Sequence, residues 1–223
     1  MRLSIVCGSV GLLSFAVALL GGCAIPIPQR AAEIQPPILE ALPFTAGVHY
    51  PAEFRNASKL QPRWPGFTGA MGRTLLGWSF SWEYPYGEHS VALLGACFQS
   101  MFESIVPIEA WPPPDPRGLP RVSAVMVPRL VDVGVTSITR SARVDGFLVT
   151  VTYRIEMYTP GGALLETWNV RSPAKESDGP LVGEAIHSAM TEAVAQFVRE
   201  FLERKEQIKE RLSVPAPMAK DPV

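Results

Sequence analysis

The sequence has few of the residues that bind metals, with three histidines and three cysteines among 223 residues. His49, His89 and His187 are far apart in the sequence, and no cysteine pair lies near any of them. Structural zinc sites take four Cys or His ligands, which usually come in closely spaced pairs. We therefore expect neither a metal site nor a cofactor.

An excess of positive charge is also lacking, since 20 Lys and Arg residues stand against 21 Asp and Glu residues and give a formal net charge of -1. Proteins that bind nucleic acid need a patch or stripe of cations that faces the phosphates. No such stripe occurs in the sequence, so nucleic acid is not an expected partner.

Catalytic motifs are missing as well. The Gly-x-Ser-x-Gly elbow of a hydrolase does not occur, and no glycine-rich loop has the spacing of a phosphate-binding motif. Glu88, His89 and Ser90 are neighbours at an expected helix start, where Ser and Glu commonly cap backbone N–H groups. We interpret them as capping residues, with a catalytic role as the alternative, and expect that the protein is not an enzyme.

The sequence does have an apolar leader that ends at a cysteine. Leu3 to Leu20 is almost continuously apolar after a weakly positive start, which is typical of a secretory signal. The stretch Leu20-Gly21-Gly22-Cys23 resembles the lipobox of bacterial lipoproteins. The resemblance implies cleavage between Gly22 and Cys23, a lipid on the Cys23 sulfur, and three acyl chains, such as palmitate, on the mature cysteine. An uncleaved anchor is the alternative, because ~18 to 20 apolar residues can cross a bilayer.

Ala24 follows the cysteine. In enterobacterial-type lipoproteins an aspartate at this position retains the protein in the inner membrane, so the resemblance favours the periplasmic face of the outer membrane. In either case we expect residues 24–223 to lie outside the cytoplasm and to be held at a membrane by the lipid on Cys23.

Cys97 is then the cysteine that remains for the folded part, and no disulfide within that part is expected. It lies between Leu94 and Met101 in a helical pattern. Free cysteine is among the most buried residue types. We predict that Cys97 is a small buried core residue, with a reactive thiol as the alternative.

Proline and glycine positions divide the chain into four parts. We predict a signal peptide at 1–22, a lipidated cysteine and proline-rich tether at 23–42, a single domain at 43–212 and a flexible tail at 213–223. Extended proline-rich chain spans about 3.1 Å per residue, so the tether would reach on the order of 60 Å at most.

Apolar residues that alternate with polar ones predict strands, and apolar residues at steps of three and four predict helices. The predicted elements are a strand at 44–50, a long loop at 51–74, a strand at 75–84, a helix from 86 to Pro107, a proline loop at 111–120, strands at 121–138, 146–158 and 163–170, and a helix from 181 to about 212. This order predicts an α+β fold, in which a mainly antiparallel sheet carries two long helices on one face.

Two stretches carry further expectations. The valine-rich strand at 121–138 should bend or bulge near Pro128, which cannot donate a ladder hydrogen bond. The nearly all-charged stretch 204–211 should project from the last helix into solvent, with a partner-binding helix end as the alternative.

Three stretches resemble a group of uncharacterised bacterial envelope lipoproteins. They are Gly47-Val48-His49-Tyr50, the helix entry Tyr86 to Val91 with Phe102 further along, and the hairpin Val151 to Gly162. More loosely, the predicted architecture is similar to auxiliary lipoproteins of envelope ABC transport systems and to the amino-terminal domain of the periplasmic protein TolB. The resemblance covers about residues 43 to 205 and brings no catalytic residues with it.

Candidate contact residues lie in the two proline-rich loops. Arg63, Trp64, Phe67 and Trp111 belong to the residue types that most often carry interface energy. The alternative is that each tryptophan folds back over an end of the sheet, which we favour slightly for Trp111. The sequence thus predicts a non-enzymatic outer-membrane lipoprotein that assists or assembles an envelope complex through a protein partner. A periplasmic carrier of lipid or another apolar ligand is the alternative.

Overall fold

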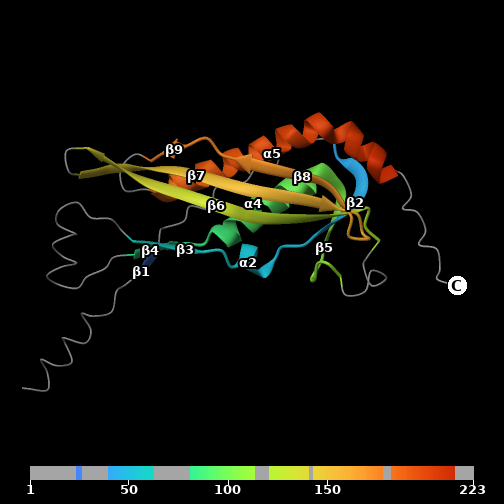
Figure 1. The fold of residues 1–223 in the computed structure, drawn as a ribbon, viewed down its shortest axis with the longest axis horizontal. Coiled ribbons are helices and arrows are strands. Elements are labelled where there is room, and N and C mark those ends of the chain that lie inside the picture. Colours follow the sequence, from blue (N-terminus) through green and yellow to red (C-terminus); the bar gives the residue numbers. More distant parts are fainter. Residues whose placement is uncertain are drawn as a thin grey trace, which may run out of the picture.

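The computed structural model describes residues 24–26, 40–62, 81–113, 121–140, 143–177 and 182–213. Within them the larger sheet has the strand order β5-β2-β6-β7-β8, and the short β9 pairs with β7 (Figure 1). Its strands are β2 (Leu42–Val48), β5 (Phe102–Pro107), β6 (Ala124–Arg140), β7 (Arg143–Tyr158), β8 (Leu164–Arg171) and β9 (Lys175–Glu176). Strands β6, β7, β8 and β9 pair in antiparallel fashion, whereas β2 is parallel to both of its neighbours.

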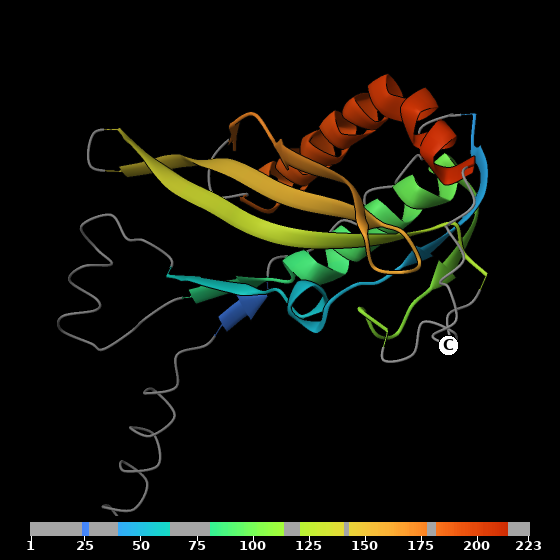
Figure 2. The same cartoon turned by 45° about the vertical axis from the view of Figure 1, so that its right-hand side comes forward.

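Two long helices, α4 (Tyr86–Met101) and α5 (Val182–Ser213), lie on the same face of this sheet (Figure 2). The predicted α+β fold, mainly antiparallel and with both helices on one face, is confirmed. The fold was predictable because apolar and polar residues alternate in β7. The apolar side chains of this strand point inward and are fully buried: Val149, Val151, Tyr153, Ile155 and Met157.

Aromatic rings fill the space between the helices and the sheet. Phe197 of α5 meets Phe98 of α4 edge to face, with ring centroids 6.0 Å apart, and meets Trp168 of β8 at 5.3 Å. A further edge-to-face pair joins Phe102 and Phe201 at 5.9 Å. Edge-to-face geometry suits the ring quadrupoles and adds to the area that each ring buries.

A smaller sheet has the strand order β1-β4-β3, with β1 (Ala24–Pro26), β3 (Lys59–Pro62) and β4 (Ser81–Tyr84). β1 falls within the predicted tether 23–42, and the last residue of that range, Leu42, is fully buried in β2. Residues 27–39 lie outside the described residues, so the tether stays a prediction. One prediction is corrected. The expected loop 51–74 contains β3 and a short helix, α2 (Ala52–Arg55). Both short strands obtain their backbone hydrogen bonds from β4, which is distant in the sequence.

The helix predicted from 86 to Pro107 ends earlier, at Met101. Phe102 has an extended backbone (φ -127°, ψ 150°), and the chain continues as β5. Ile105 therefore belongs to a strand, paired with Ala46 of β2, rather than to the helical stripe. Pairing with β2 decides the conformation here, and it overrides the local apolar spacing.

Strand β6 runs through Pro128 without a break. His49 N–H donates to the Met126 carbonyl, so the backbone of Met126 faces β2, and Pro128, two residues later, faces the same way. Its nitrogen thus points away from β7, where a ladder bond would otherwise be lost. The expected irregularity lies between Leu130 and Asp132, where the register with β7 shifts by one residue.

The prediction that the last turns of α5 project into solvent is wrong, because these turns pack on the domain. Ile208 is 2% exposed. Arg204 Nη1 lies 2.8 Å from a carboxylate oxygen of Glu166 on β8, and Lys205 Nζ lies 3.2 Å from that of Glu40. A single apolar residue among charged neighbours thus anchors this end of the helix.

The tight turn between β7 and β8 matches the predicted hairpin. Gly162 has a positive φ of 88°, a backbone conformation that glycine adopts without strain. The expected signal peptide and the chain after Ser213 lie outside the described residues. Among the described helices, none is both long enough and apolar enough to cross a bilayer.

Candidate functional site

Most of the predicted site residues, namely Gly22, Cys23, Arg63, Trp64 and Phe67, lie outside the described residues. The lipidation site and the first contact loop therefore stay predictions. Trp111 is the predicted contact residue that the described chain places.

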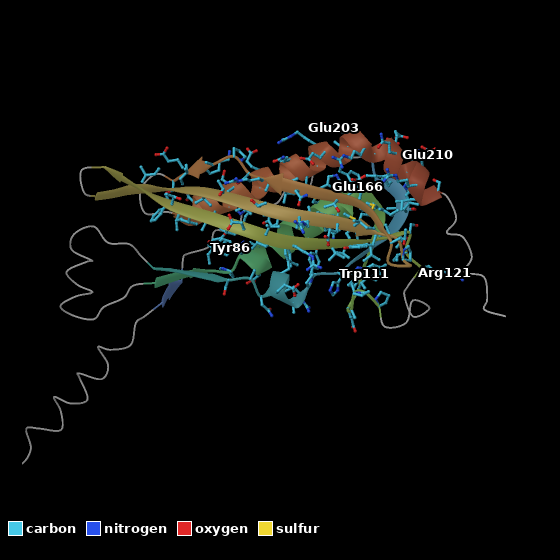
Figure 3. All side chains as sticks on the ribbon, viewed as in Figure 1. Tyr86, Trp111, Arg121, Glu166, Glu203 and Glu210 are labelled. Atoms are coloured by element: carbon cyan, nitrogen blue, oxygen red, sulfur yellow. The ribbon has the colours of Figure 1, made fainter. Side chains whose placement is uncertain are left out.

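Trp111 packs against the face of the sheet that the long helices leave open. Its ring centroid lies 5.5 Å from that of Tyr158, at an interplanar angle of 51°. It covers a small second core formed by Ile108, Val125 and Val127. Figure 3 shows Trp111 on the opposite side of the sheet from Glu203 and Glu210 of α5. Trp111 thus folds back over the sheet, as the alternative predicted, while remaining only partly buried.

A buried polar pair lies beneath the start of α4. Ser90 Oγ and Tyr153 Oη are 2.8 Å apart, and both residues are 0% exposed. The capping interpretation of Ser90 is therefore wrong. The N-cap position is Pro85, which makes no side-chain capping bond, so Ser90 is the fifth helical residue and points into the core. Its partner is 63 positions away in the sequence, and no local pattern identifies it.

Three rings gather beside this pair, from Tyr84 of β4 and from Tyr86 and His89 of α4. The Tyr84 ring lies 4.9 Å from that of Tyr86 and stacks on the His89 ring at 5.1 Å. Tyr86 Oη and His89 Nε2 are buried and have no hydrogen-bond partner among the described residues. Tyr86 and His89 share a helix face because they are three residues apart.

The short helix α2 is held tightly against this cluster at Gly87. The Gly87 N–H donates to the Ala57 carbonyl over 2.8 Å. A Cβ atom on Gly87 would overlap the backbone carbonyl oxygens of Phe54 and Arg55. Only glycine therefore allows the end of α2 to approach the first turn of α4 this closely.

Burial shifts the pKa of each of these groups in the direction that favours its uncharged form. It raises the pKa of Tyr84 to about 12 and raises the pKa of Tyr86 and Tyr153 as well. Burial lowers the pKa of His89, the nearby His187 lowers it further, and Glu88 opposes the shift. The cluster therefore offers neutral hydrogen-bonding groups.

The same reasoning applies to the candidate nucleophiles. Ser90 is paired with the protonated Tyr153 rather than with a base. Cys97 is 2% exposed, as predicted, and burial raises the pKa of its thiol to about 12. Nucleophilic catalysis requires a thiolate or a neighbouring base. Neither group is activated in the described part of the chain.

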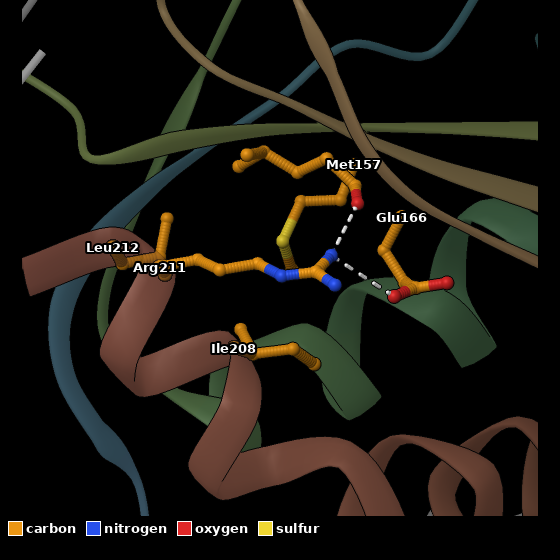
Figure 4. Close-up of a pocket in the computed structure, with 6 residues that line it drawn as sticks. Met157, Glu166, Ile208, Arg211 and Leu212 are labelled. Carbon is orange, nitrogen blue, oxygen red and sulfur yellow. Dashed lines mark hydrogen bonds and ion pairs between the residues drawn. The ribbon is translucent and has the colours of Figure 1, made fainter. Parts of the chain in front are cut away.

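A shallow pocket of about 160 Å³ lies near the end of α5 (Figure 4). Arg211 Nη1 crosses it to donate to the Leu165 carbonyl at 2.9 Å and lies 3.4 Å from a Glu166 carboxylate oxygen. The pocket does not enclose the space of a water molecule, whereas ligand sites usually have ~300 to 1,000 Å³. Its charged groups connect α5 to β8. Within the described ranges, no three His, Cys, Asp or Glu residues are grouped as metal ligands.

Comparison with known proteins finds no matching family model and no matching curated protein. Two bacterial proteins are among the solved structures that are similar to the chain. Protein XCC0632 from Xanthomonas campestris, described under the family DUF330, has a TM-score of 0.48 and 11% sequence identity over 85% of this chain and 97% of its own. The hypothetical protein CT253 from Chlamydia trachomatis has a TM-score of 0.34 and 11% identity over 76% of this chain and 96% of its own.

These values describe a distant likeness between chains and carry no conclusion about function. The neighbours are bacterial proteins whose descriptions name no activity. The resemblance to envelope lipoproteins, to ABC-transport auxiliary lipoproteins and to the TolB domain stays a prediction.

Proposed function

We propose that this protein is a non-enzymatic, lipid-anchored accessory or assembly factor of a bacterial cell-envelope complex, held at the periplasmic face of the outer membrane. The stretch Leu20-Gly21-Gly22-Cys23 at the end of an apolar leader carries the proposal. Each buried methylene of an acyl chain contributes about 0.8 kcal/mol, so the several chains of a lipoprotein hold it almost permanently at the membrane.

The packing of the described domain supports a role for its outer surface. The interface between the helices and the sheet is filled by rings of Phe98, Phe197 and Trp168, all fully buried. A carrier of lipid would need an apolar cavity in that interface. The close ring packing therefore favours a protein that acts through contacts over the carrier alternative.

The anchor adds to such contacts by raising the local concentration of the domain. A tethered module meets its membrane-bound partner as in an intramolecular reaction, so a weak interface can still be occupied. According to this proposal, the lipid on Cys23 is part of the mechanism.

Crosslinking in intact cells followed by mass spectrometry tests the proposal. We expect the lipidated protein to crosslink to an envelope protein, and we expect replacement of Arg63 and Trp64 by alanine to weaken that crosslink with an unchanged thermal midpoint. Arg199→Ala, an exposed change on α5, is the control. Unchanged crosslinking would count against the Arg63 and Trp64 surface.

The anchor is tested separately by Cys23→Ala combined with a secretory leader whose cleavage does not require a lipidated cysteine, which leaves the mature chain without lipid. We expect this variant to lose the crosslink although the domain folds. A Cys23→Ala protein that keeps its crosslink and its cellular role from the soluble periplasm would refute the proposal.

A further inference from the structure

Three arginines cross the face of the sheet that the long helices leave open. Arg129 of β6 is directly opposite Arg154 of β7, and Arg154 is opposite Asn169 of β8. Arg171 follows Asn169 by two residues and is opposite Thr152. Along each strand the residues next to these arginines point toward the helices, and the arginines themselves are exposed. Since successive side chains of a strand point to opposite faces, the three arginines share the outward face.

Two of these arginines have no carboxylate partner in the described part of the chain. Arg129 lies 3.3 Å from carboxylate oxygens of Glu53 and Glu156. Arg154 donates through Nε to the side-chain oxygen of Asn169 at 3.1 Å, which leaves its terminal nitrogens without an acceptor among described residues. No hydrogen bond or ion pair joins the Arg171 guanidinium to that part of the chain.

The opposed Arg129 and Arg154 are only partly compensated within the domain, because both carboxylates contact Arg129 and neither contacts Arg154. Like charges directly opposite each other on one face of an antiparallel pair destabilise it. Arg154 and Arg171 are exposed, so water screens part of the repulsion, and both guanidinium groups are accessible to a partner. Neither long helix covers this face (Figure 2). An external anion would remove the repulsion.

We propose that Arg154 and Arg171, with Arg129 beside them, form a docking surface for an acidic segment of a partner protein. The inference rests on the proposed function, because it names the chemistry of the partner. Outward side chains on neighbouring strands are about 5 Å apart when opposite and about 7 to 8 Å apart along the diagonal. An extended chain brings alternate side chains to one side about 7 Å apart. A segment with Asp or Glu at alternate positions therefore matches the arginine spacing.

The rest of the face favours a peptide over an anionic membrane. Two carboxylates lie close to these arginines on neighbouring strand positions. Asp132 is opposite Thr152, and Glu156 is opposite Val127. A uniformly anionic surface would meet repulsion at both carboxylates, whereas a peptide can place neutral residues there. Tyr158 and the partly exposed Trp111 lie further along the same face and provide an aromatic anchor for the partner.

The first experiment measures binding of a dye-labelled Glu-Thr-Glu-Thr-Glu-Thr peptide to the full chain in detergent by fluorescence anisotropy. R154E/R171E should raise the Kd by at least about tenfold, since two attractive contacts become repulsive. R199E/K209E, which makes the same charge change at exposed positions of α5, should leave the Kd unchanged. Equal loss in both variants, or loss in neither, overturns the proposal.

The second experiment places a photoreactive amino acid at Asn169, between the two arginines, in cells. We expect a crosslink to an acidic segment of an envelope protein, lost in R154E/R171E and kept in R199E/K209E. A crosslink to lipid, to a second copy of the chain or to a segment without acidic residues overturns it. A crosslinker at Gln61, close in sequence to Arg63 and Trp64 but not itself a predicted contact residue, separates the two proposals. An envelope partner captured there but not at Asn169 refutes only the arginine surface, and capture at neither position refutes the proposed function.

Discussion

Replacing Gly87 with alanine should destabilise the domain by about 2 kcal/mol, because the new methyl group has no space beside α2. The atoms it would meet are the backbone carbonyl oxygens of Phe54 and Arg55. Backbone cannot rotate away as a flexible side chain can, so α2 must shift from the first turn of α4.

The magnitude follows from three contributions. Overpacking of a close contact costs about 1 to 3 kcal/mol. The shift also weakens the 2.8 Å bond from Gly87 N–H to the Ala57 carbonyl, for which a net contribution of about 1 kcal/mol is usual. The higher helix propensity of alanine relative to glycine offsets up to about 1 kcal/mol of this loss. The net loss should lower the thermal midpoint by about 4 to 8 °C in a domain of this size.

Gly95 provides a matched control in the same helix. The nearest atom to a Cβ at this position is Tyr50 Oη at 3.5 Å, an ordinary contact distance. Gly95→Ala should therefore gain helix propensity without overlap and raise stability by up to about 1 kcal/mol. Urea and thermal unfolding, followed by circular dichroism, compare the two variants. If Gly87→Ala unfolds like the parent, or if both variants lose stability equally, the close approach of α2 is not what requires glycine.

Three further predictions concern buried groups. Ser90→Ala should lower the free energy of unfolding by about 1 to 3 kcal/mol, because Tyr153 Oη loses its hydrogen-bond partner. In a double-mutant cycle measured by urea unfolding, adding Tyr153→Phe should recover part of this loss. Additive losses of the two single variants would contradict the pairing. The Cys97 thiol should resist iodoacetamide in the folded mature protein at pH 8 and react once unfolded in urea, since burial raises its pKa to about 12, and rapid labelling of the folded protein would exclude a buried thiol. Since burial lowers the pKa of His89, its contribution to stability is full above the unfolded pKa of about 6.5 and is lost as the pH falls below it. The free energy of unfolding of His89→Phe, measured in urea at several pH values, should fall less steeply on acidification than that of the parent. Identical slopes against pH for the two proteins would contradict the lowered pKa of His89.

Elements whose stabilising contacts are local could be predicted from the sequence. The alternation in 146–158 gives β7 and its buried face, and the apolar stripe after Pro180 gives α5. The Pro160-Gly161-Gly162 turn joins β7 to β8 as the sequence indicates. In each case a single segment contains the whole signal.

Elements that depend on distant partners could not be predicted. β1 and β3 are short and obtain their pairing from β4. The end of α4 is set by β2, which precedes it by more than fifty residues. Likewise, Ile208 is surrounded by charged residues in the sequence, and only the fold brings Met157 and Leu165 close to it.

The arginine surface illustrates the same limit. Alternation alone places Arg154 and Arg171 on the outward faces of their strands. Which residues they oppose depends on the register, which shifts between Leu130 and Asp132 and again near Tyr158. A slip of one residue would move the whole set to the other face. The sequence therefore contains the charges but not their juxtaposition.

The position of β2 has a consequence for how the domain assembles. β2 is the first strand of the larger sheet in the chain, but it lies between β5 and β6, which are made later. β6, β7 and β8 follow one another through short turns and can pair as soon as they emerge, whereas distant pairs must first overcome loop-closure entropy. We therefore expect the C-terminal hairpins to form before the N-terminal strand inserts. Until Phe102–Pro107 and Ala124–Met126 are in place, Leu42–Val48 remains an unpaired apolar segment, and we expect it to be the part of the nascent chain that most needs protection from aggregation.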